Sequence, residues 1–527
     1  MREPVDRFSR WLPWAALGLV LLVVVAVRVR LLTVPLERDE GEYAYIGSLL
    51  LHGVPPWAEA WNMKWPGVYA LYALLIGVGG PNVAAIHAGL LVASAWSALA
   101  CALLARRWFG DGAAAVAGAA YAAASVSPAV FGLWAHAEQF AVAAALAGLL
   151  LAQHARGRGG LAGAGLLLGA AVVVKQNAAP LALFGALGVT LTHARGRRAE
   201  SLARLGAFGA GIIAMPAVTL AGLWAAGVFP RFWFWTVTYA ASYGSQVSLG
   251  RGLGDLELAL RRLWHDQAVW WAAAALGLAA PLWNAELRRG VGFGAALLAA
   301  GLVGASLGFY FRPQYFVLAL PGLALLAGAG AQALPLRSPR AHGWACAGLA
   351  AAGLVTPIGV RSDVLVRATP DQASRAVYAL NPFPEAVVLG REIAARTRPG
   401  DRIAVLGSEP EIPFYAGRRS ATGYIYAYPL MEPQPYARAM QEEMVAQLEA
   451  ARPEILVWVN VSTSWLMRAE SPHVLLDWAA SAAQSDYDAV GVADILPGGT
   501  RYVFGEAARS YQPESKYWVS VLQRRQP

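Results

Sequence analysis

Residues 37–67 read ERDEGEYAYIGSLLLHGVPPWAEAWNMKWPG, and they begin with four charged side chains among residues 38–42. After these charges, apolar residues recur at helical spacing as far as Leu51. This pattern predicts an amphipathic helix that lies along a membrane surface rather than crossing it. Lys64 follows near the end of the same stretch. Because carboxylates and a lysine share one short loop beside a bilayer, we predict that this loop is the active site.

The chain before this loop begins with basic residues and continues with the apolar run Trp11–Val27. A cleaved signal peptide is the alternative, but no small-residue cleavage pattern follows. We therefore expect an uncleaved first span with a cytoplasmic amino end, which makes the loop at 37–67 extracytoplasmic. Val68–Val78, at about 11 residues, is too short to cross a bilayer and predicts a second surface helix or a re-entrant segment.

The composition indicates an integral membrane protein. Of 527 residues, 57% are hydrophobic and only 14% are charged, and uncharged windows of about 20 residues are typical of membrane-spanning helices. The net charge of +9 is explained by arginines in short loops and does not indicate nucleic-acid binding. With the first span, we expect about eleven transmembrane helices, the others near residues 82–105, 112–133, 138–153, 160–175, 177–193, 203–226, 267–285, 291–309, 314–333 and 342–360.

Alternate loops differ in arginine content, which predicts the orientation of the spans. The arginine-rich loops, expected inside, contain Arg106–Arg107, Arg156 and Arg158, Arg195, Arg197 and Arg198, Arg288–Arg289, and Arg337 and Arg340. The arginine-poor loops, expected outside, contain His136, Glu138, Lys175 and Arg312. A longer outside loop is expected at 227–266, and its aromatic cluster is typical of an interfacial belt or, alternatively, of a lipid-tail groove.

After about residue 361 the charge rises and strand-like runs appear, at Arg402–Leu406, Ile455–Val459, Ala489–Ile495 and Arg501–Phe504. Residues 436–451 have helical spacing between them. The sequence therefore predicts two domains, a transmembrane domain at 1–360 and a small α/β domain at 361–527. An odd number of spans places the second domain outside the cell.

The acidic residues of the first loop are the candidate catalytic groups. Asp39 and Glu40 are candidates for a general base that takes a proton from an acceptor hydroxyl. A solvated helix cap is the alternative for these carboxylates, and especially for Glu42. A divalent cation, Mg²⁺ or Mn²⁺, is a further alternative, because oxygen and imidazole ligands suit it. Its candidate ligands are Asp39, Glu40, His136 and Glu138.

Three cations are expected at the same outer face as these acids. Lys64, Lys175 and Arg312 each lie at the edge of an apolar run, where snorkelling of a single side chain is the alternative. Together they are suited to bind a phosphate or diphosphate, and a lipid-borne phosphate lies at headgroup height. Arg28 and Arg30 lie slightly deeper, as candidate partners of Asp39 or Glu40.

The apolar anchor followed by Asp39-Glu40-Gly41-Glu42-Tyr43-Ala44 and later by Asn62-Met63-Lys64-Trp65-Pro66-Gly67 resembles the GT-C superfamily of integral-membrane glycosyltransferases. It is most similar to bacterial members of glycosyltransferase family 39, which contains protein mannosyltransferases and the lipid A aminoarabinose transferase. The similarity covers roughly residues 10–360. The stretch 401–428 also resembles the extracytoplasmic tail of other bacterial members.

This resemblance implies transfer of a sugar from a polyprenyl-phosphate donor to a lipid, glycan or protein acceptor at the outer face of the bacterial inner membrane. It assigns the catalytic base to Asp39 and the contact with the donor phosphate to Lys64. One position departs from the pattern, because relatives often have a carboxylate immediately before this lysine and this chain has Met63. No nucleotide site is needed, since the leaving group is a lipid phosphate.

Two other classes of protein are kept as alternatives. A transporter or lipid flippase is also polytopic, but transporters usually place ionisable groups near the bilayer midplane and often contain repeats. Here the ionisable residues gather at one face, and the sequence shows no repeat. A non-catalytic assembly subunit with the same fold is the second alternative, and it is suggested by Met63.

Overall fold

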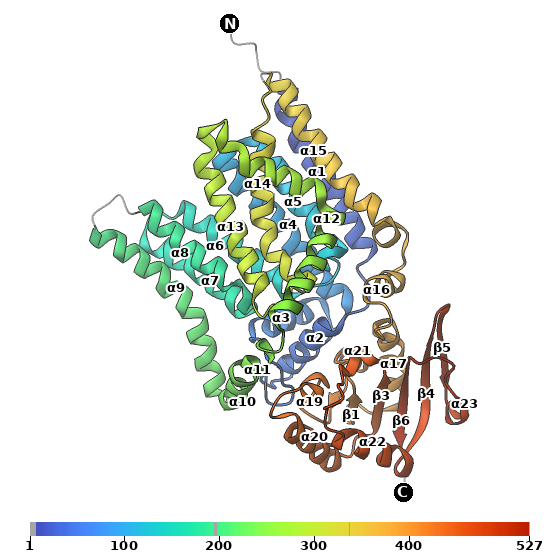
Figure 1. The fold of residues 1–527 in the computed structure, drawn as a ribbon. Helices are drawn as coiled ribbons and strands as arrows, with labels where there is room; N and C mark the ends of the chain where they lie inside the picture. The colour runs from blue at the N-terminus through green and yellow to red at the C-terminus, as the bar shows by residue number, and fades with distance from the viewer. Residues whose placement is uncertain (1–6, 194–197, 337, 526–527) are drawn as a thin grey trace.

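The computed structural model describes residues 7–193, 198–336 and 338–525. The arginines predicted to orient the chain at positions 195, 197 and 337 lie outside this range. The start of α1 (Arg7–Arg30) and the carboxy-terminal sheet lie at opposite ends of the molecule (Figure 1).

Long helices follow the predicted apolar segments and form a bundle. Six helical stretches of the described chain are long and apolar enough to cross a membrane, at 11–30, 83–109, 199–225, 285–306, 313–332 and 339–360. This confirms a helical membrane protein, while the number of eleven spans stays a prediction. The helices of the bundle are α1 (Arg7–Arg30), α4 (Val83–Phe109), α5 (Asp111–Ser125), α6 (Ala137–His154), α7 (Arg158–Val174), α8 (Ala179–His193), α9 (Arg198–Ala225), α12 (Leu249–Ala279), α13 (Arg288–Ser306), α14 (Leu320–Gln332) and α15 (Pro339–Val360).

Small residues allow the central helices of the bundle to approach closely. The alanine-rich helix α5 is buried from Ala113 to Ser125. Where α12 meets α14, a Cβ atom on Gly277 would stand 1.9 Å from the carbonyl oxygen of Leu326. A Cβ atom on Gly330 would stand 2.1 Å from that of Ala273. Such contact between backbones is typical of helix packing in lipid.

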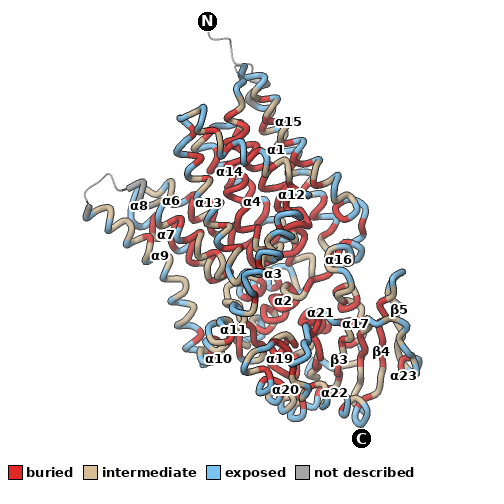
Figure 2. Tube along the Cα trace, in the orientation of Figure 1, coloured by how far each residue is buried: buried red, intermediate tan, exposed pale blue. Residues whose placement is uncertain are grey.

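The first loop forms two helices, α2 (Arg38–Leu51) and α3 (Gly67–Gly79), which lie between the bundle and the carboxy-terminal sheet (Figure 1). The first of these helices is enclosed by protein, and its position along the membrane surface stays a prediction. Tyr43, Tyr45 and Ile46 are buried together with the acidic residues Glu40 and Glu42. Figure 2 shows α2 coloured mostly as buried. The polar face of α2 is covered by the carboxy-terminal part of the chain, so its amphipathic pattern reflects two protein neighbours rather than lipid and water.

The predicted outside loop at 227–266 is largely helical. It contains α10 (Phe229–Trp233), the π-helix η3 (Phe234–Tyr239), α11 (Ala240–Gly244) and the first part of α12, which is kinked at Gln267. Several of its aromatic side chains are buried against other rings, with Phe232 4.9 Å from Trp57 between ring centroids. For these rings, the prediction of an interfacial belt or lipid-tail groove is wrong.

The carboxy-terminal part contains a six-stranded mixed sheet in the order β2-β1-β3-β6-β4-β5. Strands β1, β2 and β3 are parallel, and β6 is antiparallel to β3 and β4. The four predicted strands are confirmed, as is the helix predicted at 436–451. The strands are β1 (Arg402–Leu406), β2 (Arg419–Ser420), β3 (Ile455–Asn460), β4 (Tyr487–Leu496), β5 (Gly499–Phe504) and β6 (Trp518–Arg524). The remaining helices are α16 (Pro370–Tyr378), α17 (Phe383–Arg396), α18 (Glu411–Ala416), α19 (Tyr428–Met431), α20 (Ala437–Ala451), α21 (Ser462–Trp465), α22 (Val474–Ser485) and α23 (Glu506–Ser510).

Candidate active site

The amino end of α2 is fixed by its own cap and by the carboxy-terminal part of the chain. Glu37 and Glu40 form a reciprocal capping box, in which each carboxylate accepts a hydrogen bond from the backbone N–H of the other. Arg38 donates to the carbonyl oxygen of Ser408 at 2.5 Å and pairs with Glu409 at 2.8 Å. The first turn of α2 is therefore held between two parts of the chain.

Lys64 lies between two carboxylates of α2. Its Nζ atom is 2.8 Å from Oδ1 of Asp39 and 2.5 Å from Oε2 of Glu42. Tyr69 donates to the other oxygen of Glu42 at 2.5 Å. The side chain of Glu42 has no exposed surface, whereas that of Asp39 is 26% exposed. Asp39 is therefore the carboxylate of this pair that a substrate can reach, and Glu42 is not the solvated cap that we had considered.

The surrounding charges hold Asp39 ionised. Burial alone would raise the pKa of Asp39, but the positive charge of Lys64, with smaller effects of His136 and Lys175, outweighs it and holds the pKa below its usual range. Burial would lower the pKa of the Lys64 ammonium, but Asp39 and Glu42 raise it well above its usual range. Burial raises the pKa of Glu42, and Lys64 opposes that rise. The cluster is thus an ion pair between Lys64 and Asp39, with Glu42 as a second partner.

Glu40 points elsewhere. Its Oε1 atom is 3.0 Å from Nε2 of His87 and accepts from the backbone N–H of Ala135 at 2.5 Å. It is fully buried and joins α2 to α4 and to the start of α6. Glu40 was predicted as a second catalytic group, but the structure places it in these structural contacts.

The four predicted metal ligands do not converge. Glu40 binds His87, and Glu138 pairs with Lys175 at 2.9 Å. The residues that come together are Glu37, Asp39 and His136, whose ligand atoms lie within 4.8 Å of one another. Nδ1 of His136 is buried without a hydrogen-bond partner, which suits a metal ligand, but the ammonium group of Lys64 beside Asp39 opposes a cation there. These residues therefore fit a metal ion only in part.

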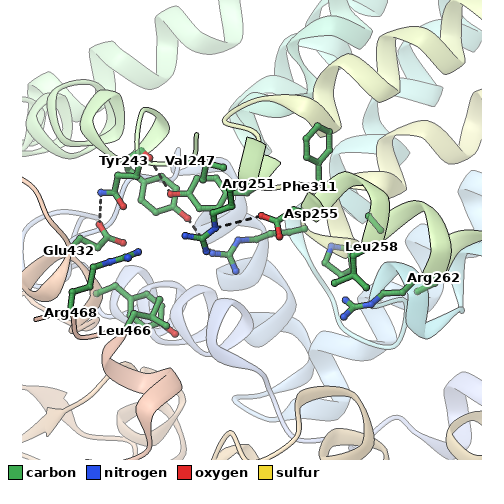
Figure 3. A pocket seen from close by; sticks show the side chains of 17 residues that line it. Tyr243, Val247, Arg251, Asp255, Leu258, Arg262, Phe311, Glu432, Leu466 and Arg468 are labelled. Atoms are coloured by element: carbon green, nitrogen blue, oxygen red, sulfur yellow. Dashed lines mark hydrogen bonds and ion pairs between the residues drawn. The ribbon is translucent and has the colours of Figure 1, made fainter. Parts of the chain in front are cut away.

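Lys175 and Arg312 were predicted to bind phosphate with Lys64. Lys175 is buried and pairs with Glu138. Its Nζ atom also lies 5.3 Å from the centroid of the Tyr315 ring. Arg312 instead reaches a cavity of about 280 Å³ between α11, α12 and the carboxy-terminal part of the chain, which we call the arginine cavity (Figure 3). The structure thus places Arg312 at this cavity, Lys64 in its ion pair with Asp39 with a side chain that is 15% exposed, and Lys175 in a buried ion pair.

The arginine cavity carries an excess of positive charge. Arg312 donates to the hydroxyl of Tyr243 at 3.3 Å, and Arg251 is 3.9 Å from Asp255. Arg262 and Arg468 also line the cavity, and within the described chain neither guanidinium group has an ion-pair partner within 4.0 Å (Figure 3). Two acidic residues, Asp255 and Glu432, thus face four arginines. Such an arrangement favours an anionic ligand.

Two tyrosines connect the arginine cavity to the carboxylates that pair with Lys64. Tyr428 lines the cavity, and its ring lies 5.7 Å from the ring of Tyr426, centroid to centroid. Tyr426 in turn contacts Glu42 through its hydroxyl at 3.0 Å. The charge of Asp39 also acts on Arg312.

Arg28 and Arg30 were candidate partners of Asp39 or Glu40, and the structure gives them other partners. Arg28 donates to the carbonyl oxygen of Gly132 at 2.7 Å, and Arg30 to that of Ala368 at 2.5 Å. Both side chains donate hydrogen bonds to backbone carbonyl groups at the end of the bundle. The carboxylates of α2 pair with Lys64 and His87 instead.

Several residues of the site were not predicted from the sequence, namely Glu37, Tyr69, Arg251, Arg262, Tyr426 and Arg468. Glu37 and Tyr69 lie in or beside the quoted loop, and their contacts follow from the fold of that loop. Arg251 and Arg262 lie in a segment that was predicted as a loop but forms the start of α12. Tyr426 lies in the stretch 401–428, which resembles the extracytoplasmic tail of other bacterial members. That resemblance gave no reason to place Tyr426 at the site.

No family model and no curated protein matches this chain. Solved structures do match. ArnT from Cupriavidus metallidurans bound to undecaprenyl phosphate has 18% sequence identity and a TM-score of 0.58, over 96% of this chain and 97% of that chain. The same protein in the apo state has 17% identity and a TM-score of 0.54, over 96% and 98%. A weaker likeness is to the oligosaccharyltransferase from Archaeoglobus fulgidus in complex with Zn and sulfate, with 14% identity and a TM-score of 0.48, over 97% and 75%. The chain has the GT-C fold, as the resemblance implied.

Proposed function

We propose that this protein is a glycosyltransferase that moves a sugar from a polyprenyl-phosphate donor to an acceptor hydroxyl at the outer face of the inner membrane. The observation that carries the proposal is the ionised and partly exposed Asp39, paired with Lys64 close to a cavity lined by arginines. A base that a substrate can reach and an anion-binding cavity are the two parts that this transfer needs.

The arginine cavity is suited to hold the phosphate and sugar of the donor. Its volume of about 280 Å³ is roughly nine times the share of one water molecule in the liquid, so it has room for more than a single ion. The guanidinium groups bind phosphate oxygens through paired N–H donors. Gln246 and Glu432 lie at the same cavity and offer hydrogen bonds to hydroxyl groups.

In the proposed reaction, the acceptor oxygen forms a bond to the anomeric carbon of the sugar. The bond between that carbon and the phosphate oxygen breaks, and the lipid phosphate leaves with the bonding electrons. The acceptor proton goes to Asp39. Lys64 and Arg312 stabilise the charge that develops on the leaving phosphate.

Binding of the donor makes Asp39 a stronger base. A phosphate competes with Asp39 for the ammonium group of Lys64, which is the largest of the charges that lower the pKa of Asp39. When Lys64 turns to the phosphate, the pKa of Asp39 rises toward its usual value. The base is therefore activated only when a donor is present.

Glu42 supplies the carboxylate that is missing at Met63. Relatives often have a carboxylate immediately before the lysine, and in this chain Glu42 brings a second carboxylate to Lys64 from α2. The charge around the lysine is thus retained, which favours a catalytic role over a non-catalytic subunit. The ionisable groups of the candidate site also gather at one end of the bundle, beside the carboxy-terminal sheet. This arrangement argues against a transporter, which usually places such groups near the bilayer midplane.

ArnT, whose structure was solved with undecaprenyl phosphate, supports the class of donor, since the similarity spans nearly all of both chains. The test is to incubate the purified protein with a panel of undecaprenyl-phosphate sugars and to measure consumption of each donor and release of undecaprenyl phosphate. We expect at least one donor to be consumed in the presence of membrane lipids and glycans as acceptors. Consumption of none of them, by protein whose folding has been verified by thermal unfolding, would overturn the proposal.

A further inference from the structure

Tyr426 belongs to the carboxy-terminal part of the chain, yet its hydroxyl lies among the charged groups of α2. The hydroxyl oxygen is 3.0 Å from Oε2 of Glu42, 3.4 Å from Oδ1 of Asp39 and 3.0 Å from the carbonyl oxygen of Arg38. The residue is only 6% exposed. A residue nearly 390 positions away in the sequence thus contacts both carboxylates that bind Lys64.

The segment that carries Tyr426 is held on both sides. The backbone N–H of Ala427 donates to Oγ of Ser408 at 2.9 Å, and the carbonyl oxygen of Ser408 accepts from Arg38. On the other side, the backbone N–H of Trp61 donates to the carbonyl oxygen of Gly423 at 2.9 Å. Gly423 lies so close to Trp61 that a Cβ atom there would stand 2.3 Å from the indole ring. The position of the Tyr426 hydroxyl is therefore fixed.

This contact becomes important when the donor binds, and this step of the argument rests on the proposed function. Lys64 then turns to the phosphate, and Asp39 and Glu42 both lose a hydrogen-bond donor. Tyr69 still donates to Glu42. Apart from Lys64, Tyr426 is the side chain in the described part of the structure whose donor atom lies within hydrogen-bond distance of both carboxylates, so its one hydroxyl hydrogen can be donated to either of them.

We propose that Tyr426 is a positioning residue, which holds Asp39 and Glu42 in place while Lys64 binds the phosphate of the donor. Its hydroxyl keeps the oxygen of Asp39 directed toward the acceptor and lowers the repulsion between the two carboxylates. The carboxy-terminal part of the chain is then a component of the active site and not only its cover.

The groups that face Asp39 decide what loss of the hydroxyl does to the pH profile. The positive groups Lys64, Lys175 and Arg312 come from the first loop, from the end of α7 and from the segment before α14. The imidazole of His136 comes from the residue before α6, and the carboxyl groups of Glu42 and Glu37 come from α2 and its cap. Because a hydroxyl that donates to a carboxylate favours its ionised form, removing the hydroxyl of Tyr426 raises the pH at which Asp39 becomes protonated.

The test compares Tyr426→Phe with the wild type and with a matched control, Tyr45→Phe. Tyr45 lies on α2, and its hydroxyl accepts a hydrogen bond from the backbone N–H of Ser420 in the carboxy-terminal part at 2.7 Å. Like Tyr426, it therefore joins these two parts of the chain, but this hydrogen bond does not involve Asp39 or Lys64. We expect kcat to fall at least about tenfold in Tyr426→Phe, because one hydrogen bond to a charged group is lost. We expect KM for the donor to change little and the acid limb of kcat/KM to move to higher pH. Tyr45→Phe is expected to keep the wild-type acid limb.

The outcomes separate the inference from the proposed function. The inference is overturned if the wild type consumes donor and Tyr426→Phe retains its kcat and its acid limb. It is also overturned if both variants lose activity equally without a shift of the acid limb, since the contact would then be structural. Failure of the wild type to consume any donor would overturn the proposed function, and the inference with it.

Discussion

At the scale of single residues, Lys64 is the only positive side chain in contact with two acids of α2 among the described ion pairs, and one of these acids, Glu42, has no exposed surface. Replacing Lys64 with methionine removes the charge and leaves Asp39 and Glu42 unpaired beside each other. Loss of one partner of a buried pair costs about 3–5 kcal/mol. We therefore expect Lys64→Met to lower the free energy of unfolding by about 3 kcal/mol, as well as to abolish turnover.

A double variant provides the control for this prediction. Glu42→Gln in the Lys64→Met background removes the second charge and is expected to restore most of the stability but none of the turnover. Denaturant unfolding in detergent micelles measures the first, and release of undecaprenyl phosphate measures the second. Equal stability of the wild type and Lys64→Met would show that the pair contributes nothing to folding.

Glu37 gives the site a pH dependence of its own. Burial, together with the charges of Asp39 and Glu40, raises the pKa of Glu37 well above its usual range. The protonated acid is therefore favoured in the folded protein. This stabilisation is fully present below the unfolded pKa of about 4.3 and is lost as the pH rises through the folded pKa.

Glu37→Gln imitates the protonated acid at every pH. We expect the melting temperature of this variant to increase relative to that of the wild type as the pH rises from about 5 to about 9. Differential scanning fluorimetry across this range measures the difference. A difference that is constant with pH would contradict the raised pKa.

The spacing of the acids explains which part of the site can be read from the sequence. Asp39 and Glu42 are three residues apart, so they lie on one face of α2, and Lys64 binds both. Glu37 and Glu40 have the same spacing and form the capping box. We predicted Asp39 with Glu40 as the catalytic carboxylates, whereas helical periodicity pairs Asp39 with Glu42. The contacts with Tyr426 and with the arginine cavity depend on distant parts of the chain, which no local pattern reveals.

At the scale of elements, the contact between α2 and α18 positions the site. A Cβ atom on Gly41 would stand 2.6 Å from the backbone nitrogen of Glu411. Because that neighbour is backbone, it cannot rotate away. We expect Gly41→Ala to destabilise the protein by about 1–3 kcal/mol and to reduce turnover by separating α2 from the carboxy-terminal part.

Gly18→Ala in α1 is the matched control, because no atom lies within 4 Å of its added Cβ atom. It should unfold at or slightly above the temperature of the wild type, since alanine favours helix over glycine. Thermal unfolding of the two purified variants gives the comparison. Similar melting temperatures for both would show that α2 and α18 have room to separate.

The helices of the bundle could be predicted because their apolar runs are long, whereas the protein that covers α2 could not be predicted. Its sequence has an apolar face and a charged face, as a surface helix does, but the charged face is covered by residues 408–428. Two strands were also missed. Strand β2 has only two residues, and β6 lies beyond the last predicted strand and is stabilised by pairing with β3 and β4.

At the scale of the whole molecule, the arginine pattern predicts that the site and the sheet face the outside of the cell while Arg106 and Arg107 face the cytoplasm. Both native cysteines are buried, so single cysteines introduced at exposed positions can report on the two sides. We expect Ser510→Cys, in the carboxy-terminal part, to react with a membrane-impermeant maleimide in intact spheroplasts. Arg107→Cys should react only after the membrane is permeabilised. The reverse pattern would contradict the proposed orientation.

The central claim is that Asp39 is the base of a sugar transfer from a lipid phosphate, and one rate tests it most directly. Asp39→Asn keeps the size of the side chain and removes its basic oxygen. The rate to measure is the release of undecaprenyl phosphate from the preferred donor, by wild type and variant under the same conditions. We expect Asp39→Asn to release it at least about a hundredfold more slowly, with a melting temperature only slightly below that of the wild type, because the side chain is partly exposed and Lys64 keeps its pair with Glu42. A variant that releases undecaprenyl phosphate at the wild-type rate would contradict the role of Asp39 and with it the proposed mechanism.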